Sequence, residues 1–146
     1  MSLAQLIYSS TIRIDVGRRD KEFASILEAS ARRNSAAGIT GCLGHSTDWF
    51  LQVLEGEQDD VLQTFLRIEQ DKRQSEVKIL VNRDIRGRSF PDWSMAFVDL
   101  GETAPAFLSN YGVNGQLSPE TTPTSQLQLI MMELADRHRL SKRIHV

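Results

Sequence analysis

The sequence predicts an α+β fold of the ferredoxin-like type, a βαββαββ sandwich with a C-terminal helical extension. Two amphipathic helical segments each lie between β-like segments, and two apolar segments between the helices form a predicted hairpin. Helices that connect strands of one sheet act as right-handed crossovers and cover one of its faces. We therefore expect two helices on one face of a mixed five-stranded sheet.

The chain begins with a predicted strand that is followed by a predicted helix. Residues 3–10, LAQLIYSS, alternate their side chains between two faces and carry Tyr8 near the end. From Asp20, a candidate N-cap, apolar side chains such as Ile26 recur at helical spacing. The apolar stripe of this amphipathic helix ends at Asn34.

Two glycine-bounded segments follow and are typical of a hairpin. They are GITGCLGHS, residues 38–46, and WFLQVLEG, residues 49–56. Gln52 stands inside the second segment, where apolar side chains occupy both faces. Because burying an unpaired amide costs about 2–7 kcal/mol, Gln52 requires hydrogen-bond partners. Either a neighbouring part of the chain or a ligand supplies them.

The second helix is predicted over residues 57–73, EQDDVLQTFLRIEQDKR. Acidic residues occupy its first turn and basic residues its last, around an apolar stripe. Arg67 and Asp71 are expected one turn apart on this helix.

Two further strands are predicted after the second helix. Residues 76–85 alternate in polarity, and a basic turn separates them from residues 93–100. On this fifth strand, alternation predicts that Trp93, Met95 and Phe97 share one face.

The composition changes after residue 100, which divides the chain into a domain of residues 1–100 and an extension of residues 101–146. The extension begins with a connector rich in Pro, Gly, Ser and Thr. Apolar side chains at helical spacing between residues 127 and 135 then predict a tail helix. We expect this helix to cover the sheet face that the other two leave bare, with a partner surface as the alternative.

Composition excludes several classes of function. A net charge of -2, a pI near 5.9 and dispersed basic residues do not indicate a nucleic-acid partner. The sequence has neither a secretory signal nor a membrane-spanning run, so we expect a cytoplasmic protein without a membrane partner. Cys42 is the single cysteine, and the histidines lack ligand spacing, so no metal site is expected. Catalytic motifs such as a P-loop or a nucleophile elbow do not occur.

A set of polar side chains remains once the elements are placed. Tyr8, Asn34, Gln52, Arg67 and Asp71 are positioned to converge between the two helices and the sheet. Spacing alone favours ordinary structural roles: a half-buried strand aromatic, a residue at a helix end and a solvated helical ion pair.

Several fragments of the sequence match one known family in order and in spacing. They are LIYSS, ASARRNSAAGITGCL, WFLQVLEGE, RIEQDKR and RSFPDWSMAF. Over about residues 2–99 the sequence resembles the BLUF family, the blue-light receptors that bind FAD. The resemblance implies that FAD binds with its flavin ring between the two helices.

The resemblance also implies which residues contact the flavin. Tyr8 and Gln52 would lie beside the ring, and Asn34 would bond its C4 carbonyl and N3 edge. Arg33 departs from the His or Asn that many members carry at that position. The expected cofactor contacts are Tyr8, Ile26, Ser30, Arg33, Asn34, Gln52, Arg67, Asp71 and Arg73. The expected photoactive residues are Tyr8, Gln52, Trp93 and Met95.

In the family, light makes the flavin a strong oxidant, and the tyrosine gives up an electron and a proton. Their return leaves the glutamine rotated or tautomerised, with a new hydrogen bond to the C4 carbonyl and a red-shifted absorption. The resemblance thus implies a sensor that is not an enzyme and that signals to a separate effector protein. We also expect a homo-oligomer. The alternatives are a small ferredoxin-like flavoenzyme or ligand-binding module, and a cofactor-free interaction module.

Overall fold

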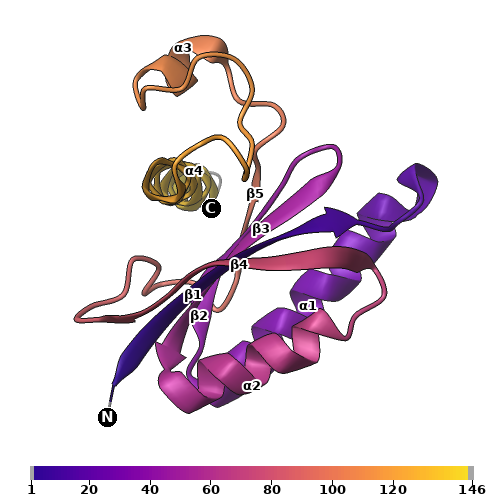
Figure 1. The fold of residues 1–146 in the computed structure, drawn as a ribbon, viewed down its shortest axis with the longest axis vertical. Helices are drawn as coiled ribbons and strands as arrows, with labels where there is room; N and C mark the ends of the chain where they lie inside the picture. Colours follow the sequence, from indigo (N-terminus) through magenta and orange to yellow (C-terminus); the bar gives the residue numbers. More distant parts are fainter. Residues whose placement is uncertain (1, 145–146) are drawn as a thin grey trace.

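The computed structural model describes residues 2–144, with side chains described as far as residue 137. Its strands and helices follow the predicted βαββαββ order with further helices at the end, as Figure 1 shows. In chain order they are β1 (Leu3–Ile12), the 3-10 turn η1 (Val16–Arg18), α1 (Arg19–Ala37), β2 (Thr40–His45), β3 (Trp49–Glu57), α2 (Gln58–Glu69), β4 (Gln74–Ile85), β5 (Ala96–Asp99), α3 (Pro105–Ser109) and α4 (Thr124–Ile144).

The strands form one mixed sheet in the order β4-β1-β3-β2-β5. β1 pairs antiparallel with both β3 and β4, β2 pairs antiparallel with β3, and β5 runs parallel to β2. The register of β1 against β3 places Tyr8 directly opposite Gln52. The predicted five-stranded α+β fold is confirmed.

Helices cover both faces of this sheet. Figure 1 shows α1 and α2 together on one side and α4 on the other. On the first side, Leu6 and Tyr8 pack with Phe65 of α2, whereas Ile7 belongs to a separate buried cluster on the second side. That cluster includes Leu127, Ile130, Met131 and Ala135 of α4.

The tail helix therefore lies on the face that the other two helices leave bare. This explains why Leu51, Gln52 and Val53 are all buried although they alternate between faces, because neither face of β3 contacts solvent. Burial of a leucine-sized side chain contributes about 1.5–3 kcal/mol, so α4 is an integral part of the core. The division of the chain at residue 100 stays a prediction.

The first helix begins earlier than expected and ends at a glycine. Arg18 rather than Asp20 is the N-cap, and Asp20 lies in the first turn, so the predicted N-cap is wrong. The turn η1 leads directly into α1, so the helix begins at Arg19, before Asp20. At the other end Gly38 adopts a left-handed conformation with φ 69°, and its N–H donates to the carbonyl of Asn34.

The last part of the fold differs from the expected strand pattern. β5 begins at Ala96, so Trp93 and Met95 precede the strand. Trp93 packs against the cluster on the α4 side, whereas Met95 and Phe97 pack on the side of α1 and α2. The prediction that these residues share one face is wrong, because the irregular backbone before β5 does not alternate as a strand does.

A fully buried carboxyl group anchors the segment that connects β4 to β5. Glu55 accepts hydrogen bonds from Gln5 Nε2 at 2.8 Å, from the Ser89 N–H at 3.1 Å and from the Phe90 N–H at 2.8 Å. Gln128 of α4 donates to the Ser89 hydroxyl at 2.8 Å. Buried polar groups need such partners, so Glu55 joins the centre of the sheet to this connection and, through it, to α4.

None of the helices in the described part of the chain combines the length and the apolar composition that a bilayer span needs. Of the two histidines in the tail, His145 lies outside the described residues and His138 has no described side chain.

We expect Glu55→Gln to destabilise the protein by about 1–3 kcal/mol, because the new NH2 group must face a backbone N–H and leaves it unpaired. Urea unfolding followed by circular dichroism measures the change. Glu69→Gln is the matched control, since Glu69 is exposed at the end of α2 and its loss should change stability by less than about 0.5 kcal/mol. Equal stability of the two variants would contradict an anchoring role for Glu55.

Candidate functional site

A cavity lies between the sheet and the pair α1 and α2. Its walls come from β1, β2, β3, both helices and the residues that follow α2. Every cofactor contact implied by the family resemblance lines it: Tyr8, Ile26, Ser30, Arg33, Asn34, Gln52, Arg67, Asp71 and Arg73. The structure thus brings the whole expected set to one place, although it leaves the role of each residue toward a flavin as a prediction.

Sequence reasoning missed several lining residues. They are Ala29, Leu43, Phe50, Thr64, Ile68 and Gln74. Helical periodicity could have found two of them, because Thr64, Arg67 and Ile68 follow i, i+3, i+4 spacing on one face of α2. Gln74 is the first residue of β4, and its position depends on the turn after α2, for which the sequence carries no clear signal.

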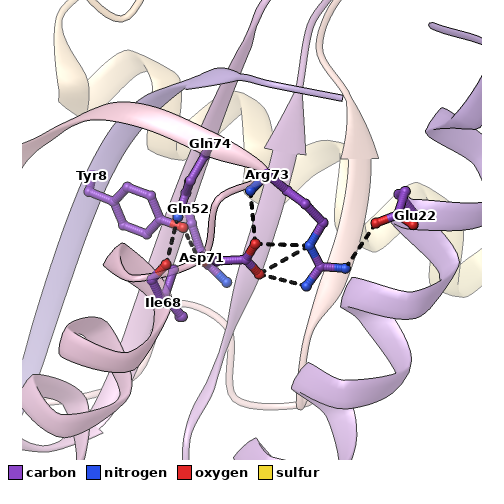
Figure 2. A network of polar contacts seen from close by, with 7 residues as sticks. All are labelled: Tyr8, Glu22, Gln52, Ile68, Asp71, Arg73 and Gln74. Atoms are coloured by element: carbon purple, nitrogen blue, oxygen red, sulfur yellow. Dashed lines mark hydrogen bonds and ion pairs between the residues drawn. The ribbon is translucent and has the colours of Figure 1, made fainter. Parts of the chain in front are cut away.

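A chain of polar contacts runs through the inner wall of the cavity. The Tyr8 hydroxyl donates to Gln52 Oε1 at 2.5 Å, and Gln52 Nε2 donates to the Met95 sulfur at 3.4 Å. The side chains of Tyr8 and Gln52, shown in Figure 2, are only 2% and 3% exposed. Since a thioether is a weak acceptor, the Gln52 amide is held firmly at its oxygen and loosely at its nitrogen.

The environment of Tyr8 keeps its hydroxyl protonated. Burial raises the pKa of Tyr8 far above its ordinary value, the charge of Asp71 raises it further, and a hydrogen bond with Gln74 opposes the shift. The ring also makes an edge-on contact with Phe65, with centroids 5.6 Å apart. At neutral pH, Tyr8 is therefore a neutral hydrogen-bond donor in a fixed orientation.

Asn34 connects α1 to the segment before β5. It lies in the last turn of α1 and is 2% exposed. Its Nδ2 donates to the backbone carbonyl of Ser94 at 2.8 Å, one residue before Met95. The carboxamides of Asn34 and Gln52 therefore flank the same short segment from two different elements.

Arg73 and Asp71 form an ion pair at the outer part of the cavity. The expected placement of Asp71 on the second helix, one turn after Arg67, is wrong because α2 ends at Glu69. Asp71 binds Arg73, with a shortest distance of 2.6 Å. Hydrogen bonds from Arg73 hold the pKa of Asp71 below its ordinary value, and Asp71 raises the pKa of Arg73. Figure 2 shows the Arg73 guanidinium between Asp71 and Glu22 of α1.

Met95 and Trp93 occupy different environments. Met95 contacts Gln52 behind the cavity wall, whereas Trp93 packs with the residues that face α4. Met95 thus contacts the polar chain through the hydrogen bond from Gln52 Nε2.

The chemistry of the cavity fits a flavin ring. Ile26, Phe50 and Ile68 provide apolar surface for a planar aromatic system. Asn34 and Gln52 each carry one amide acceptor and one amide donor, which the alternating carbonyl and N–H groups of the flavin pyrimidine edge require. Both side chains line the cavity, Asn34 from α1 and Gln52 from β3.

The family model for sensors of blue light using FAD, named BLUF, matches residues 3–96. The chain belongs to the BLUF family. This BLUF protein is accordingly a blue-light sensor of the kind that uses FAD. The matched region contains β1 to β4 and both helices that line the cavity, and it ends at the first residue of β5.

Relatives and solved structures agree with this assignment. The photoactivated adenylate cyclase subunit beta-like protein FB of Euglena gracilis is 34% identical over 95 residues, which cover 64% of this chain and 11% of that protein. A structure named "BlsA photo-activated state" aligns with TM-score 0.79 and 29% identity over 91% of this chain and 94% of its own. BlrB, a BLUF protein in its dark state, aligns with TM-score 0.64 and 34% identity over 68% of this chain and 74% of its own.

These relatives and structures match different extents of this chain and of their own length. The chain spans only 11% of the length of the first cyclase relatives, so the likeness to them concerns the sensor region. The likeness to BlsA covers 91% of this chain, which is more than the family-matched region, and therefore extends into the part that contains α3 and α4.

Proposed function

We propose that this BLUF protein senses light through the pair Tyr8 and Gln52 and passes its signal through Met95 and α4 to a separate effector protein. The observation that carries the proposal is the buried chain from the Tyr8 hydroxyl through the Gln52 amide to the Met95 sulfur. This chain joins the wall of the flavin cavity to the segment that leads into β5.

In this proposal Tyr8 is the electron and proton donor. When bound, FAD supplies blue-light absorption and an excited ring that is a strong oxidant. The hydroxyl of Tyr8 points at Gln52 Oε1 at 2.5 Å, so its proton moves to that oxygen as its electron leaves. Because burial raises the pKa of Tyr8, the proton does not leave on its own at neutral pH. Electron and proton both return to Tyr8 at the end of the cycle.

In this proposal, Gln52 is the residue that switches between two hydrogen-bonding states. A proton that reaches Gln52 Oε1 weakens the hydrogen bond that holds the amide oxygen. The amide nitrogen is bound only to the thioether of Met95. Rotation or tautomerisation then presents an N–H group to the cavity, where it can donate to a carbonyl of the ring edge. The two states of the Gln52 amide make similar numbers of hydrogen bonds, so their free energies can lie close together.

Met95 is the proposed exit for the signal. A changed amide loses or alters its contact with Met95, which immediately precedes β5. Val98 and Leu100 at β5 belong to the same buried cluster as Ile130 and Met131 of α4. A shift of β5 would therefore alter the packing of α4, which is the element that we propose contacts the effector. A cytoplasmic location and a homo-oligomeric state stay predictions.

The deciding experiment is the absorption spectrum of the purified protein loaded with FAD. A sensor shows a reversible red shift under blue light. A flavin that only a chemical reductant bleaches would instead favour a small flavoenzyme, and a protein that binds no flavin would favour an interaction module.

We expect Gln52→Leu to bind FAD but to lose the light-induced red shift, because leucine keeps the shape of the side chain and removes the switching amide. Difference spectra before and after blue light measure this. Gln63→Leu makes the same chemical change on the exposed side of α2 and should shift normally. A normal shift in Gln52→Leu would contradict the role of Gln52.

We expect Tyr8→Phe to fold and bind FAD but to lose the reversible photocycle, since phenylalanine cannot supply the proton. Transient absorption after a blue pulse measures the loss. Tyr111→Phe is the control, because Tyr111 packs against Phe107 of α3, away from the cavity. If Tyr8→Phe cycles like the wild type, Tyr8 is not the donor.

We expect Met95→Ala to keep the red shift but to lose the light-dependent change in α4. Hydrogen exchange of residues 124–137 in dark and light measures this change. Met95→Leu retains the volume without the sulfur, so comparison of the two variants separates packing from hydrogen bonding. An unchanged α4 response in Met95→Ala would mean that the signal leaves by another route, for which α2 is the next candidate.

A further inference from the structure

A second glutamine, Gln74, lies beside the Tyr8 hydroxyl. It is the first residue of β4, it is half-buried, and it lines the same cavity as Tyr8 and Gln52. Figure 2 shows the end of its side chain next to the Tyr8 hydroxyl, with which it forms a hydrogen bond. Tyr8 is therefore in contact with two carboxamides, one from β3 and one from β4.

Both ends of the Gln74 amide are fixed by neighbouring groups. The Ser10 hydroxyl donates to Gln74 Oε1 at 2.5 Å, and Gln74 Nε2 donates to the Ile68 carbonyl at 3.0 Å. A backbone carbonyl can only accept, so the nitrogen end of the amide must face Ile68. Gln52 differs in this respect, because its nitrogen is bound only to a thioether. Gln74 is thus an amide with one orientation beside an amide that we propose switches.

The fixed orientation of Gln74 decides how it binds Tyr8. An amide nitrogen carries two hydrogens, and the Ile68 carbonyl accepts one of them. The hydrogen bond with Gln74 lowers the pKa of Tyr8, which is the effect of a donor on the phenolic oxygen. That oxygen can accept from Gln74 while its own O–H donates to Gln52 Oε1.

We propose that Gln74 is a positioning residue for Tyr8, which donates its second N–H to the Tyr8 oxygen and thereby directs the Tyr8 proton to Gln52. The N–H group cannot accept a hydrogen bond, so the Tyr8 O–H has no acceptor on the Gln74 side. Accepting a hydrogen bond also strengthens the one that a hydroxyl donates. This inference rests on the proposed function, because it takes Tyr8 as the proton donor.

The role of Gln74 in the light reaction is to hold the Tyr8 oxygen while its O–H bond breaks. The electron of Tyr8 passes to the excited flavin, which is the oxidant, and its proton passes to Gln52 Oε1. Gln74 neither gains nor loses a proton, and its N–H keeps the bond to the Tyr8 oxygen. The oxygen therefore stays in position to receive the proton when the electron returns.

Infrared spectroscopy of the FAD-loaded protein in the dark, with isotope-labelled tyrosine, tests the contact without any light reaction. The chain contains two tyrosines, so a Tyr111→Phe background leaves only the signal of Tyr8. Accepting a hydrogen bond weakens the phenolic C–O bond and lowers its stretching frequency. We expect Gln74→Met, which keeps the length of the side chain and removes the amide, to raise this frequency.

The lifetime of flavin fluorescence tests the effect on the light reaction, because it reports how fast Tyr8 gives up its electron. We expect Gln74→Met to lengthen the lifetime about fivefold, the factor that one hydrogen bond of ordinary net strength represents. Ser10→Ala should change the C–O frequency and the lifetime in the same directions but by less, because it frees only the oxygen end of Gln74.

The matched control is Gln70→Met, which makes the same chemical change at an exposed position that does not line the cavity. It should leave the Tyr8 C–O frequency and the fluorescence lifetime unchanged. If Gln74→Met fails to bind FAD, the comparison of Ser10→Ala with Gln70→Met decides by the same two measurements.

An unchanged C–O frequency in Gln74→Met would overturn the proposal, and so would an equal change in the control. A frequency change without a longer fluorescence lifetime would overturn the positioning role. These outcomes are distinct from failure of the proposed function. A normal light-induced red shift in Gln52→Leu would contradict the proposed switch, whereas a raised C–O frequency in Gln74→Met would still support Gln74 as a donor to Tyr8.

Discussion

The hydrogen bond from Tyr8 to Gln52 connects neighbouring strands in the middle of the sheet, and the site depends on it. Both side chains are almost completely buried, at 2% and 3% exposure. An unpaired amide in such surroundings would cost about 2–7 kcal/mol, so the register of β1 against β3 and the orientation of the amide stabilise each other. Any change in the partners of Gln52 therefore acts on the sheet as well as on the cavity.

The covering of both sheet faces makes this coupling possible. Ile7 packs toward α4 and its neighbour Tyr8 packs toward α2. A one-residue shift in the register of β1 would therefore turn the side chains that face one core toward the other. The core around α4 thus holds the site residues in position from the opposite face of the sheet. Phe90 joins the same core while its N–H bonds Glu55, which fixes the connection to β5 on which Met95 lies. Rigid packing on the α4 face thus supports Gln52, the side chain that we propose switches between two states on the other face.

Electrostatics divides the cavity region into an inner and an outer part. The inner part contains neutral amides and a phenol that burial keeps protonated, and the outer part contains the ion pairs around Arg73. Charges near solvent can exchange partners at small cost, whereas buried neutral groups keep their geometry.

Sequence alone determined the order of the elements, the amphipathic helices and the set of polar residues at the cavity, because each depends on periodicity or on motifs within a short stretch. Only the tertiary structure decided which of these residues are partners. It paired Asp71 with Arg73 because α2 ends before Asp71, and it separated Trp93 from Met95 because the backbone there is not a strand. Cross-strand register, helix ends and the placement of α4 arise from contacts between residues far apart in the chain, which local periodicity does not encode.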